Sequence, residues 1–348
     1  MIERARLESL LAGFGQLTIG LVGDLFLDRY LEIDPDLSEP SIETGLEAYQ
    51  VTRIRNQPGA LGTVLNNLAA LGVGRLLPVT VLGDDGQAYD LLRELGQLGV
   101  DTTHVIKDPA RLTPTYTKPL RRNADGTWSE LNRLDLRNTS PLDEATLERL
   151  AAVLSRVFRE VDGLIVLDQV NEESAGVVGP AVRDLLARLS KEQPEKLIFI
   201  DSRRYIQSFR CGTLKANAVE CLRAVGGVEA ELSQQVLDPD AGPAAAETLS
   251  ARTGLPVYCT LGDRGILVVR PGEASELVPG YLVEGPIDIV GAGDSSTAAM
   301  VASLLAGGTS IEAAVVGNLA ASITVQQLGT TGTASPAQVL ERWRQTHE

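Results

Sequence analysis

The residues with the clearest capacity for chemistry are Gly291, Ala292, Gly293 and Asp294, which directly precede an apolar segment of helical length. Glycines before a helix let a ligand approach the backbone closely, so that several amide N–H groups point toward it. The helix N-terminus adds a positive partial charge, and the pattern therefore predicts a site for an anion whose charge grows during a reaction. The Asp294 carboxylate stands where it can take a proton from a nucleophile beside that anion. This arrangement suits phosphoryl transfer.

The same residues also fit an ordinary helix N-terminus, with glycines for the turn and Asp294 as the cap. The segment is not a P-loop, because the Gly-Lys-Ser/Thr ending is missing. A GxGxxG motif does not follow the first apolar strand, which disfavours a dinucleotide-binding fold. A Ser-His-Asp triad is disfavoured too, because it would have to use His104 in an ordinary-looking segment; the other histidine, His347, is next to the C-terminus.

Composition narrows the class of protein. The 348 residues carry 31 Lys and Arg against 46 Asp and Glu, a formal net charge of −15. A chain this acidic is repelled by phosphate backbones, so we expect no nucleic-acid binding, although a local basic pocket can hold a small anion. Hydrophobic residues make up 44% of the chain, which is enough for a packed core. The three cysteines form no CxxC pair, which disfavours a disulfide scaffold and a structural zinc site.

Two segments bear on localisation. Residues 1–11 have the pattern of a charged amphipathic helix and not that of a signal peptide. Residues 295–340 contain only one charged side chain, Glu312, but glycines and polar residues interrupt this stretch. Two helices buried in a core fit it better than a membrane hairpin. We therefore expect a cytoplasmic protein without membrane contact.

Short apolar runs alternate with segments of helical periodicity between residues 60 and 270. Strands are predicted at residues 17–22, 76–82, 163–167, 197–200, 257–260 and 266–269, and helices at residues 61–71, 89–98, 142–157 and 182–189. Ser140-Pro141 is expected to open the third of these helices. The alternation predicts an α/β fold with a mostly parallel sheet and helices on both faces, in which ligands bind at the carboxyl ends of the strands.

Residues 29–57 and 112–136 depart from this alternation. Both are extended, and the second carries Trp128 beside an Asn-Ala-Asp-Gly turn. We predict short strands that leave the main sheet and form a small β-sheet lid over the cleft, with plain surface loops as the alternative. The lid segments then lie within one domain that spans residues 1–348.

The Gly-Ala-Gly-Asp motif, with Asp288 ahead of it, resembles the signature of the ribokinase (PfkB) family of carbohydrate kinases. Segments that agree with this family in order and spacing are Gly23-Asp24 and residues 59–72, 82–86, 217–220, 260–265, 318 and 329–333. The resemblance covers residues 15–340. It implies a ribokinase-like fold and the ATP-dependent phosphorylation of a hydroxyl of a sugar or sugar phosphate. Residues 23–30 and 328–336 look most like the heptose-7-phosphate kinase branch, the kinase half of a bifunctional ADP-heptose synthesis enzyme.

The resemblance also implies roles for individual residues. Asp294 would be the general base, and the amides of Gly291, Ala292 and Gly293 would hold the transferring phosphoryl group. The residues implied to bind the sugar are Asp24, Gly59, Thr63 and Asn67, and those implied to bind ATP are Asn217, Glu220, Thr260, Gly262, Gly265 and Asn318. Glu220 would also hold a magnesium-bound water, and Asp288 a monovalent cation such as K⁺.

Four cations, Lys118, Arg121, Arg122 and Arg133, lie within sixteen residues of the predicted lid. Guanidinium groups match phosphate geometry, so we predict that Lys118, Arg122 and Arg133 bind a phosphate already present on the substrate. Arg203-Arg204, at the end of a strand, is a second candidate. A solvated surface hairpin is the alternative interpretation of the lid cations.

The chain also departs from the family pattern. Ala60 replaces the second of two adjacent glycines, Thr63 replaces an Asn, and Val290 replaces a Thr, while residues 201–203 read Asp-Ser-Arg in place of Asp-Pro-Lys. These differences concern the substrate more than phosphoryl transfer. They leave two alternatives, a kinase for a nucleoside or other small alcohol on the same fold, and a catalytically silent sugar- or nucleotide-binding protein. The resemblance further implies a homodimer formed through the lid.

Overall fold

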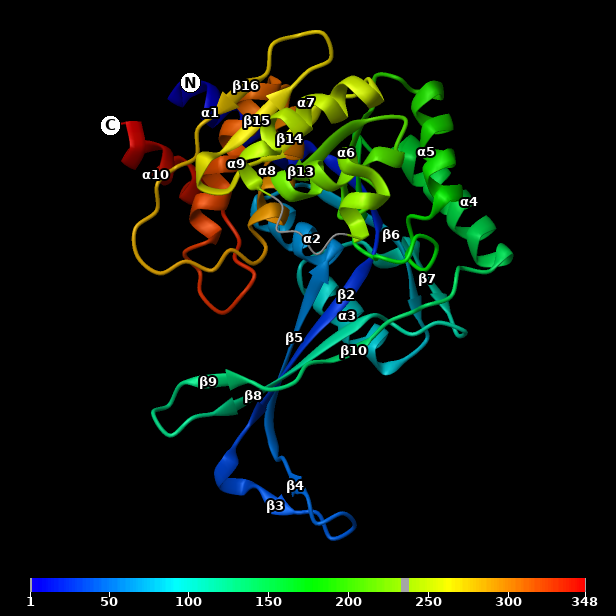
Figure 1. Ribbon diagram of the computed structural model, residues 1–348, viewed down its shortest axis with the longest axis vertical. Coiled ribbons are helices and arrows are strands. Elements are labelled where there is room, and N and C mark those ends of the chain that lie inside the picture. The colour runs from blue at the N-terminus through cyan, green and yellow to red at the C-terminus, as the bar shows by residue number, and fades with distance from the viewer. Residues whose placement is uncertain (1, 233–237, 348) are drawn as a thin grey trace.

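A computed structural model describes residues 2–232 and 238–347 (Figure 1). Its main sheet has nine strands in the spatial order β16 (Glu276–Val278), β15 (Ile266–Val269), β14 (Val257–Thr260), β13 (Thr213–Asn217), β12 (Leu197–Ser202), β11 (Gly163–Asp168), β1 (Thr18–Gly23), β6 (Arg75–Gly83) and β7 (Val105–Asp108). Every pair from β14 to β7 is parallel, and only β15 and β16 join antiparallel. The predicted mostly parallel sheet is therefore confirmed.

Helices cover both faces of this sheet (Figure 1). They are α1 (Arg4–Gly13), α2 (Leu61–Ala70), α3 (Gly86–Gln97), α4 (Glu144–Glu160), α5 (Pro180–Glu192), α6 (Ala218–Leu232), α7 (Gly242–Thr253), α8 (Ala292–Leu305), α9 (Ser310–Thr324) and α10 (Pro336–His347). One core cluster joins α1, α2, α8 and α9 to the sheet, and the other joins α4, α5, α6 and α7 to it. The nearly charge-free residues 295–340 thus supply buried helices, as predicted, and within residues 2–232 and 238–347 no helix is both long and apolar enough to cross a membrane.

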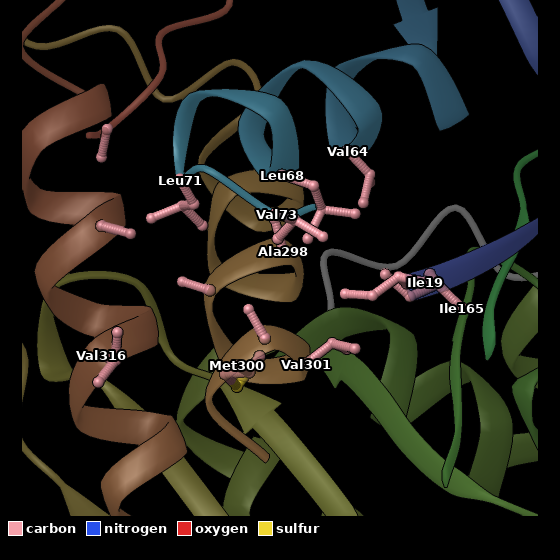
Figure 2. Packing of buried hydrophobic residues seen from close by; sticks show 14 of the residues in the cluster. Ile19, Val64, Leu68, Leu71, Val73, Ile165, Ala298, Met300, Val301 and Val316 are labelled. Atoms are coloured by element: carbon pink, nitrogen blue, oxygen red, sulfur yellow. The ribbon is translucent and has the colours of Figure 1, made fainter. Parts of the chain in front are cut away.

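The packing of α2 against α8 fixes the two segments that matter most for the site. Figure 2 shows Leu68 and Val73, from α2 and the turn after it, above Ala298 of α8, with Met300 and Val301 one turn further along. All five side chains are at most 9% exposed. Because this interface is apolar and buried, the first turns of α2 and α8 are held in a fixed relation to each other.

The start of α4 differs from the prediction. The helix begins at Glu144 and not at Pro141, and its N-cap is Asp143, whose carboxylate accepts the Thr146 amide at 2.7 Å. The Ser140-Pro141 prediction is therefore wrong. Aspartate is as strong a cap as serine, and an acidic residue at the next position adds a favourable interaction with the helix dipole.

The second sheet is the predicted lid, and it extends away from the main body (Figure 1). It contains β10 (Leu134–Leu136), β8 (Thr115–Arg122), β2 (Leu25–Ile33) and β5 (Val51–Ala60), with β9 (Trp128–Glu130) on the edge of β8. A small hairpin of β3 (Glu39–Pro40) and β4 (Glu47–Ala48) lies at its far end. The prediction that these segments leave the main sheet as strands is confirmed.

Ala60, at the junction of β5 and α2, is the one non-glycine residue of the described ranges with a positive φ, at φ 51° and ψ −116°. Such a backbone costs a residue with a Cβ about 1–3 kcal/mol. We therefore expect Ala60→Gly to raise the free energy of unfolding by about 1 kcal/mol, measured by urea denaturation. The control is Ala69→Gly in the body of α2, which should lower it by roughly 0.5–1 kcal/mol. Equal destabilisation by both changes would show that Ala60 is not strained.

Candidate active site

The Gly-Ala-Gly-Asp motif forms the first turn of α8, at the carboxyl edge of the main sheet. Gly291 is the N-cap, in the left-handed region at φ 82°, and its carbonyl accepts the Ser295 amide at 2.9 Å. The Ala292 amide donates to the Ile289 carbonyl at 3.2 Å. The amides of Gly293 and Asp294 have no partner among the described residues, as expected for the first turn of a helix. Two backbone donors and the helix dipole are therefore available to an anion.

Asp294 is half-buried, and its carboxylate makes no hydrogen bond to any residue that the structure describes. It is therefore not the helix cap that the alternative interpretation required. Burial raises the pKa of Asp294 to about 7, with a further contribution from Asp201, while the charges of Lys215 and Arg203 act in the opposite direction. A carboxyl group with a pKa near neutrality and no competing partner is suited to accept a proton.

A buried ion pair lies next to this turn. Lys215 of β13 and Asp201 of β12 are neighbours in the register of the sheet, and the distance from Lys215 Nζ to Asp201 Oδ2 is 2.6 Å. The Thr297 hydroxyl also donates to Asp201, at 3.3 Å. A Cβ on Gly293 would lie 3.1 Å from Lys215 Nζ, so the ammonium group is adjacent to the glycine of the anion site.

Lys215 therefore places a fixed positive charge beside the anion site. Burial alone would lower its pKa, but Asp201, Glu220 and Asp294 raise the pKa above its ordinary value, so the group stays charged. Sequence analysis did not identify this residue. The sequence does contain a sign that this residue is special, because it is a lysine inside an otherwise apolar run, directly before Ala216-Asn217.

We expect Gly293→Val to abolish turnover while the far-UV circular dichroism spectrum stays unchanged. The added branch would crowd Lys215 Nζ and occupy the space in front of the free amides. The control is Gly96→Val in α3, where a Cβ meets nothing within 4 Å, so that only helix propensity changes. Normal turnover by the Gly293 variant would show that the segment is only a structural turn.

The first turn of α2 faces the same site. Thr63 is buried, and a Cβ on Gly291 would lie 3.5 Å from its Cγ2 and 3.4 Å from Thr331. At Gly59 a Cβ would overlap the Asp28 carboxylate, so a larger residue there would displace that side chain. Asn67 is 1% exposed and its amide donates to the Thr63 carbonyl at 2.9 Å. The structure thus brings Thr63 to the motif, whereas the Asn67 side chain is engaged inside its own helix.

Asp24 lies at the end of β1, as expected. It is 3% exposed, and its carboxylate accepts the amides of Gln169 at 3.0 Å, Val170 at 3.3 Å and Val177 at 2.7 Å. Burial raises the pKa of Asp24, and these three amides oppose the rise. Nearby Asp168, which sequence analysis missed, accepts the Ser202 hydroxyl at 2.7 Å. Burial and the charge of Asp24 raise the pKa of Asp168 to about 7.

The residues predicted to bind nucleotide lie at the ends of β13 and β14. Asn217 and Thr260 are paired across these strands. Asn217 and Glu220 also form a reciprocal cap of α6, because the Asn217 amide donates to Glu220 at 2.7 Å and the Glu220 amide donates to Asn217 at 2.9 Å. Burial and the charge of Asp201 raise the pKa of Glu220. The N-x-x-E element therefore has a structural role whatever else it binds.

The turn of residues 260–265, which is predicted to bind nucleotide, packs against a fixed neighbouring segment. Gly262 and Gly265 both have positive φ, and a Cβ on Gly265 would overlap the Val278 carbonyl. The amide group of Asn318 donates to the carbonyls of Val278 and Pro279, both at 3.1 Å. The Asn318 side chain is thus used to fix the segment against which the turn packs.

The two residues predicted to hold cations, Asp288 and Glu220, have different surroundings. The carboxylate of Asp288, the residue predicted to hold a monovalent cation, accepts the amides of Val290 at 3.0 Å and Gly329 at 3.3 Å. These bonds tie the loop before α8 to the loop after α9. In the part of the chain that is described, no group of three or more His, Cys, Asp or Glu side chains could hold a metal ion. The half-buried Glu220 fits Mg²⁺ bound through water and nucleotide phosphates, because that ion keeps several waters and needs few carboxylates.

The lid cations are all paired within the lid. Lys118 lies 3.0 Å from Asp28, and Arg133 lies 2.7 Å from Asp135. Arg122 lies 2.7 Å from Asp34 and 2.9 Å from Asp36, and Arg121 lies 3.5 Å from Glu47. Lys118 also lines a hollow between the lid and the loops that follow β16 and α9, together with Tyr30, Trp128, Asp288 and Thr331. This part of the lid therefore lies beside those loops.

These features define a phosphotransferase site on an α/β fold, and comparison with known proteins supports that class. The sequence profile of the pfkB family carbohydrate kinases matches residues 30–338. The chain belongs to this family, and the predictions of the carbohydrate kinase family and of a ribokinase-like fold are confirmed.

The sequence identity to individual relatives is low. The chain is 27% identical over 341 residues to the bifunctional protein HldE of Geobacter metallireducens, covering 97% of this chain and 65% of that protein. It is 30% identical over 320 residues to the HldE protein of Azorhizobium caulinodans, covering 90% of this chain and 61% of the relative. The chain thus spans less than two-thirds of the length of these curated relatives.

Solved structures share the fold. Phosphofructokinase-2 of Escherichia coli in complex with potassium superposes with a TM-score of 0.69 at 18% identity, covering 95% of this chain and all of that one. Ribokinase of Arabidopsis thaliana, complexed with ribose and ATP, superposes with a TM-score of 0.63 at 19% identity, covering 94% and 98% of the two chains.

Proposed function

We propose that the protein transfers the γ-phosphoryl group of ATP to a hydroxyl of a sugar or sugar phosphate, with residues 1–348 acting as one kinase domain. The observation that carries this proposal is Asp294, a half-buried carboxylate with no hydrogen-bond partner among the described residues and a pKa raised by burial to about 7. It stands at a helix N-terminus with two free amides and the Lys215 ammonium beside it.

The mechanism follows from this placement. Asp294 takes the proton from the acceptor hydroxyl as that oxygen attacks the phosphoryl group. The free amides of Gly293 and Asp294 and the nearby Lys215 charge stabilise the negative charge on the transferring group. Bound Mg²⁺ would neutralise the triphosphate, and Glu220 is the residue that would hold one of its waters. A monovalent cation such as K⁺ would lie beside Asp288.

The acceptor is proposed to lie between the main sheet and the lid. Asp24 at the end of β1, Gly59 near the end of β5 and Thr63 of α2 would line the base of this space, and Lys118 of β8 would line its lid side. The nucleotide is proposed to lie along Asn217, the turn of residues 260–265 and the segment held by Asn318. The names of two similar proteins, ribokinase and phosphofructokinase-2, favour a sugar or sugar phosphate over a nucleoside.

The lid is also proposed to form a homodimer. The lid and the β3–β4 hairpin at its end expose large apolar side chains, among them Ile42, Leu46, Ile54 and Leu134. Isolated apolar side chains are normal on a surface, but several on one small lid favour a contact surface. Sedimentation velocity should show a dimer that dissociates in an Ile54→Lys variant with wild-type helix content, and a monomeric wild type would contradict the proposal.

The experiment that tests the proposed function measures ADP release from Mg-ATP with a panel of sugars and sugar phosphates. We expect at least one acceptor to raise the rate well above the basal hydrolysis of ATP. Binding of nucleotide and sugars without any stimulated ADP release would instead identify a catalytically silent binding protein.

A further inference from the structure

The segment between β11 and α5 forms one wall of the space proposed for the acceptor. Residues 169–179 connect these two elements through turns and bends. A hollow between the main sheet and the lid is lined by six of these residues, Gln169, Val170, Asn171, Glu172, Ala175 and Val177. Phe26 and Tyr116 line its lid side. The conformation of the segment therefore sets the shape of the space in which the acceptor would bind.

The Asp24 carboxylate binds both ends of this segment. Its Oδ2 accepts the amides of Gln169 at 3.0 Å and Val170 at 3.3 Å, and its Oδ1 accepts the amide of Val177 at 2.7 Å. One side chain thus closes residues 169–177 into a compact loop whose ends lie together. Hydrogen bonds from amides to an ionised carboxylate are roughly twice as strong as those between neutral groups. The conformation of the loop therefore depends on Asp24.

The same carboxylate has little capacity left for a ligand. An ionised carboxylate offers about four lone-pair sites, and the three amides occupy three of them. A Cβ on Gly176 would lie 2.9 Å from Asp24 Oδ1 and 3.1 Å from Oδ2, so the backbone of the segment lies directly against both oxygens. Asp24 is only 3% exposed. An acceptor hydroxyl would therefore have to displace an amide in order to reach it.

Other contacts of the segment act on different backbone groups. The Tyr205 hydroxyl donates to the Asn171 carbonyl at 2.6 Å, and the Arg111 guanidinium group donates to the Ala175 carbonyl, also at 2.6 Å. Each of these donors holds a single point in the middle of the segment. Of these three anchors, Asp24 is the one that joins the beginning of the segment to its end.

We propose that Asp24 is a positioning residue, which gathers residues 169–177 into the wall of the acceptor space and does not itself bind the acceptor. This inference rests on the proposed function, because it concerns the acceptor of that same site. Asp24 thereby has a different role from the direct sugar binding that the family resemblance implied. The acceptor meets the side chains of the segment, such as those of Gln169 and Asn171, while the buried charge serves the backbone amides.

Hydrogen exchange followed by mass spectrometry tests the positioning role without any acceptor or nucleotide. In Asp24→Asn an NH2 group replaces one accepting oxygen, so at least one of the three amides loses its partner. Exchange in the peptide covering residues 169–178 should then include an amide that is about 10–100-fold faster than in wild type, the effect of losing one hydrogen bond to a charged group. The control is Asp162→Asn. Asp162 accepts the Thr18 amide at 2.7 Å at the opposite end of β1, so this peptide should not change.

A second variant crowds the carboxylate without changing its charge. The methyl group of Gly176→Ala would lie 2.9 Å from Asp24 Oδ1, so it should push the segment away and speed exchange in the same peptide. Gly179→Ala is the matched control in this segment. Its Cβ would have only ordinary contacts, at 3.6 Å and 3.9 Å, and exchange should stay as in wild type.

Steady-state kinetics tests whether the acceptor contacts Asp24. The acceptors are ribose, glucose, ribose 5-phosphate and glucose 6-phosphate, each compared with analogues that lack one hydroxyl, at carbon 2 or carbon 3. Asp24→Asn and Gly176→Ala should both raise KM for the acceptor about tenfold or more, with kcat within a few-fold of wild type. The rise in KM should be the same for a parent sugar and its deoxy analogues. Calorimetric titration with a non-hydrolysable ATP analogue gives the same comparison as Kd values.

Two results would overturn the inference while leaving the kinase activity intact. One is unchanged exchange of residues 169–178 in both Asp24→Asn and Gly176→Ala, which would show that Asp24 does not hold the segment. The other is an effect of Asp24→Asn that vanishes for one deoxy analogue while Gly176→Ala keeps the wild-type KM, which would show that the carboxylate binds that hydroxyl. Faster exchange in both variants, with equal losses in Kd for parent and deoxy sugars but no turnover by wild type, would support the inference and reject the proposed function.

Discussion

Asp294→Asn is expected to lower kcat by about 10²–10⁴-fold while the Kd for nucleotide stays nearly unchanged. The amide has the size of the carboxylate but cannot take a proton from the acceptor hydroxyl. No hydrogen bond of the described structure is lost, because the Asp294 carboxylate makes none. The change also removes a carboxylate whose pKa is raised to about 7, so stability at pH 8 should not fall.

The control for this variant is Asp184→Asn. Asp184 is an exposed aspartate on α5 that is not one of the residues of the site. It should leave both kcat and nucleotide affinity at wild-type values. Turnover of the Asp294 variant within a few-fold of wild type would remove this residue from the mechanism. Loss of nucleotide affinity together with kcat would instead indicate a role in binding.

Lys215→Met is expected to lower the free energy of unfolding by about 3–5 kcal/mol and to reduce turnover as well. The change leaves the buried Asp201 carboxylate with only the Thr297 hydroxyl as a side-chain donor among the described residues. It also removes the positive charge next to Gly293. Denaturant titration measures the free energy of unfolding. Steady-state kinetics, under conditions well below the midpoint of unfolding, measures turnover.

A second change separates the two effects of Lys215. In the double variant Lys215→Met, Asp201→Asn no buried carboxylate is left unpaired, so most of the stability should return. The rate should not return, because the positive charge is still missing. Lys191→Met, at an exposed position on α5, is the control and should change neither quantity. A double variant with wild-type turnover would show that Lys215 acts only through the fold.

The arrangement of elements could be predicted because it depends on local patterns. Apolar runs alternating with helical periodicity specify a parallel sheet, and the glycines before α8 specify the turn that presents Asp294. Two extended segments that depart from this alternation were enough to predict the lid. The resemblance of the motifs to the family, in their order along the chain, then predicted the nucleotide side at residues 217–220 and 260–265.

The electrostatics of the site could not be predicted in the same way. The Lys215–Asp201 pair depends on the register between β12 and β13, and the polar Lys215 hid β13 from a search for apolar runs. The pairing of Lys118, Arg122 and Arg133 with lid carboxylates depends on where those carboxylates lie in space. The positive φ of Ala60 follows from the junction between the lid and α2, which no local pattern of that segment reveals.

The pH dependence of kcat between pH 5 and 9, at saturating ATP and acceptor, tests the role of Asp294 most directly. Because the base must be ionised and its pKa lies near 7, kcat should fall about tenfold per pH unit below that value and level off above it. The Asp294→Asn variant should show residual turnover without this acid limb, and circular dichroism should confirm that both proteins stay folded over the range. A wild-type profile that is flat from pH 5 to 8, or the same acid limb in the Asn variant, would contradict proton transfer to Asp294.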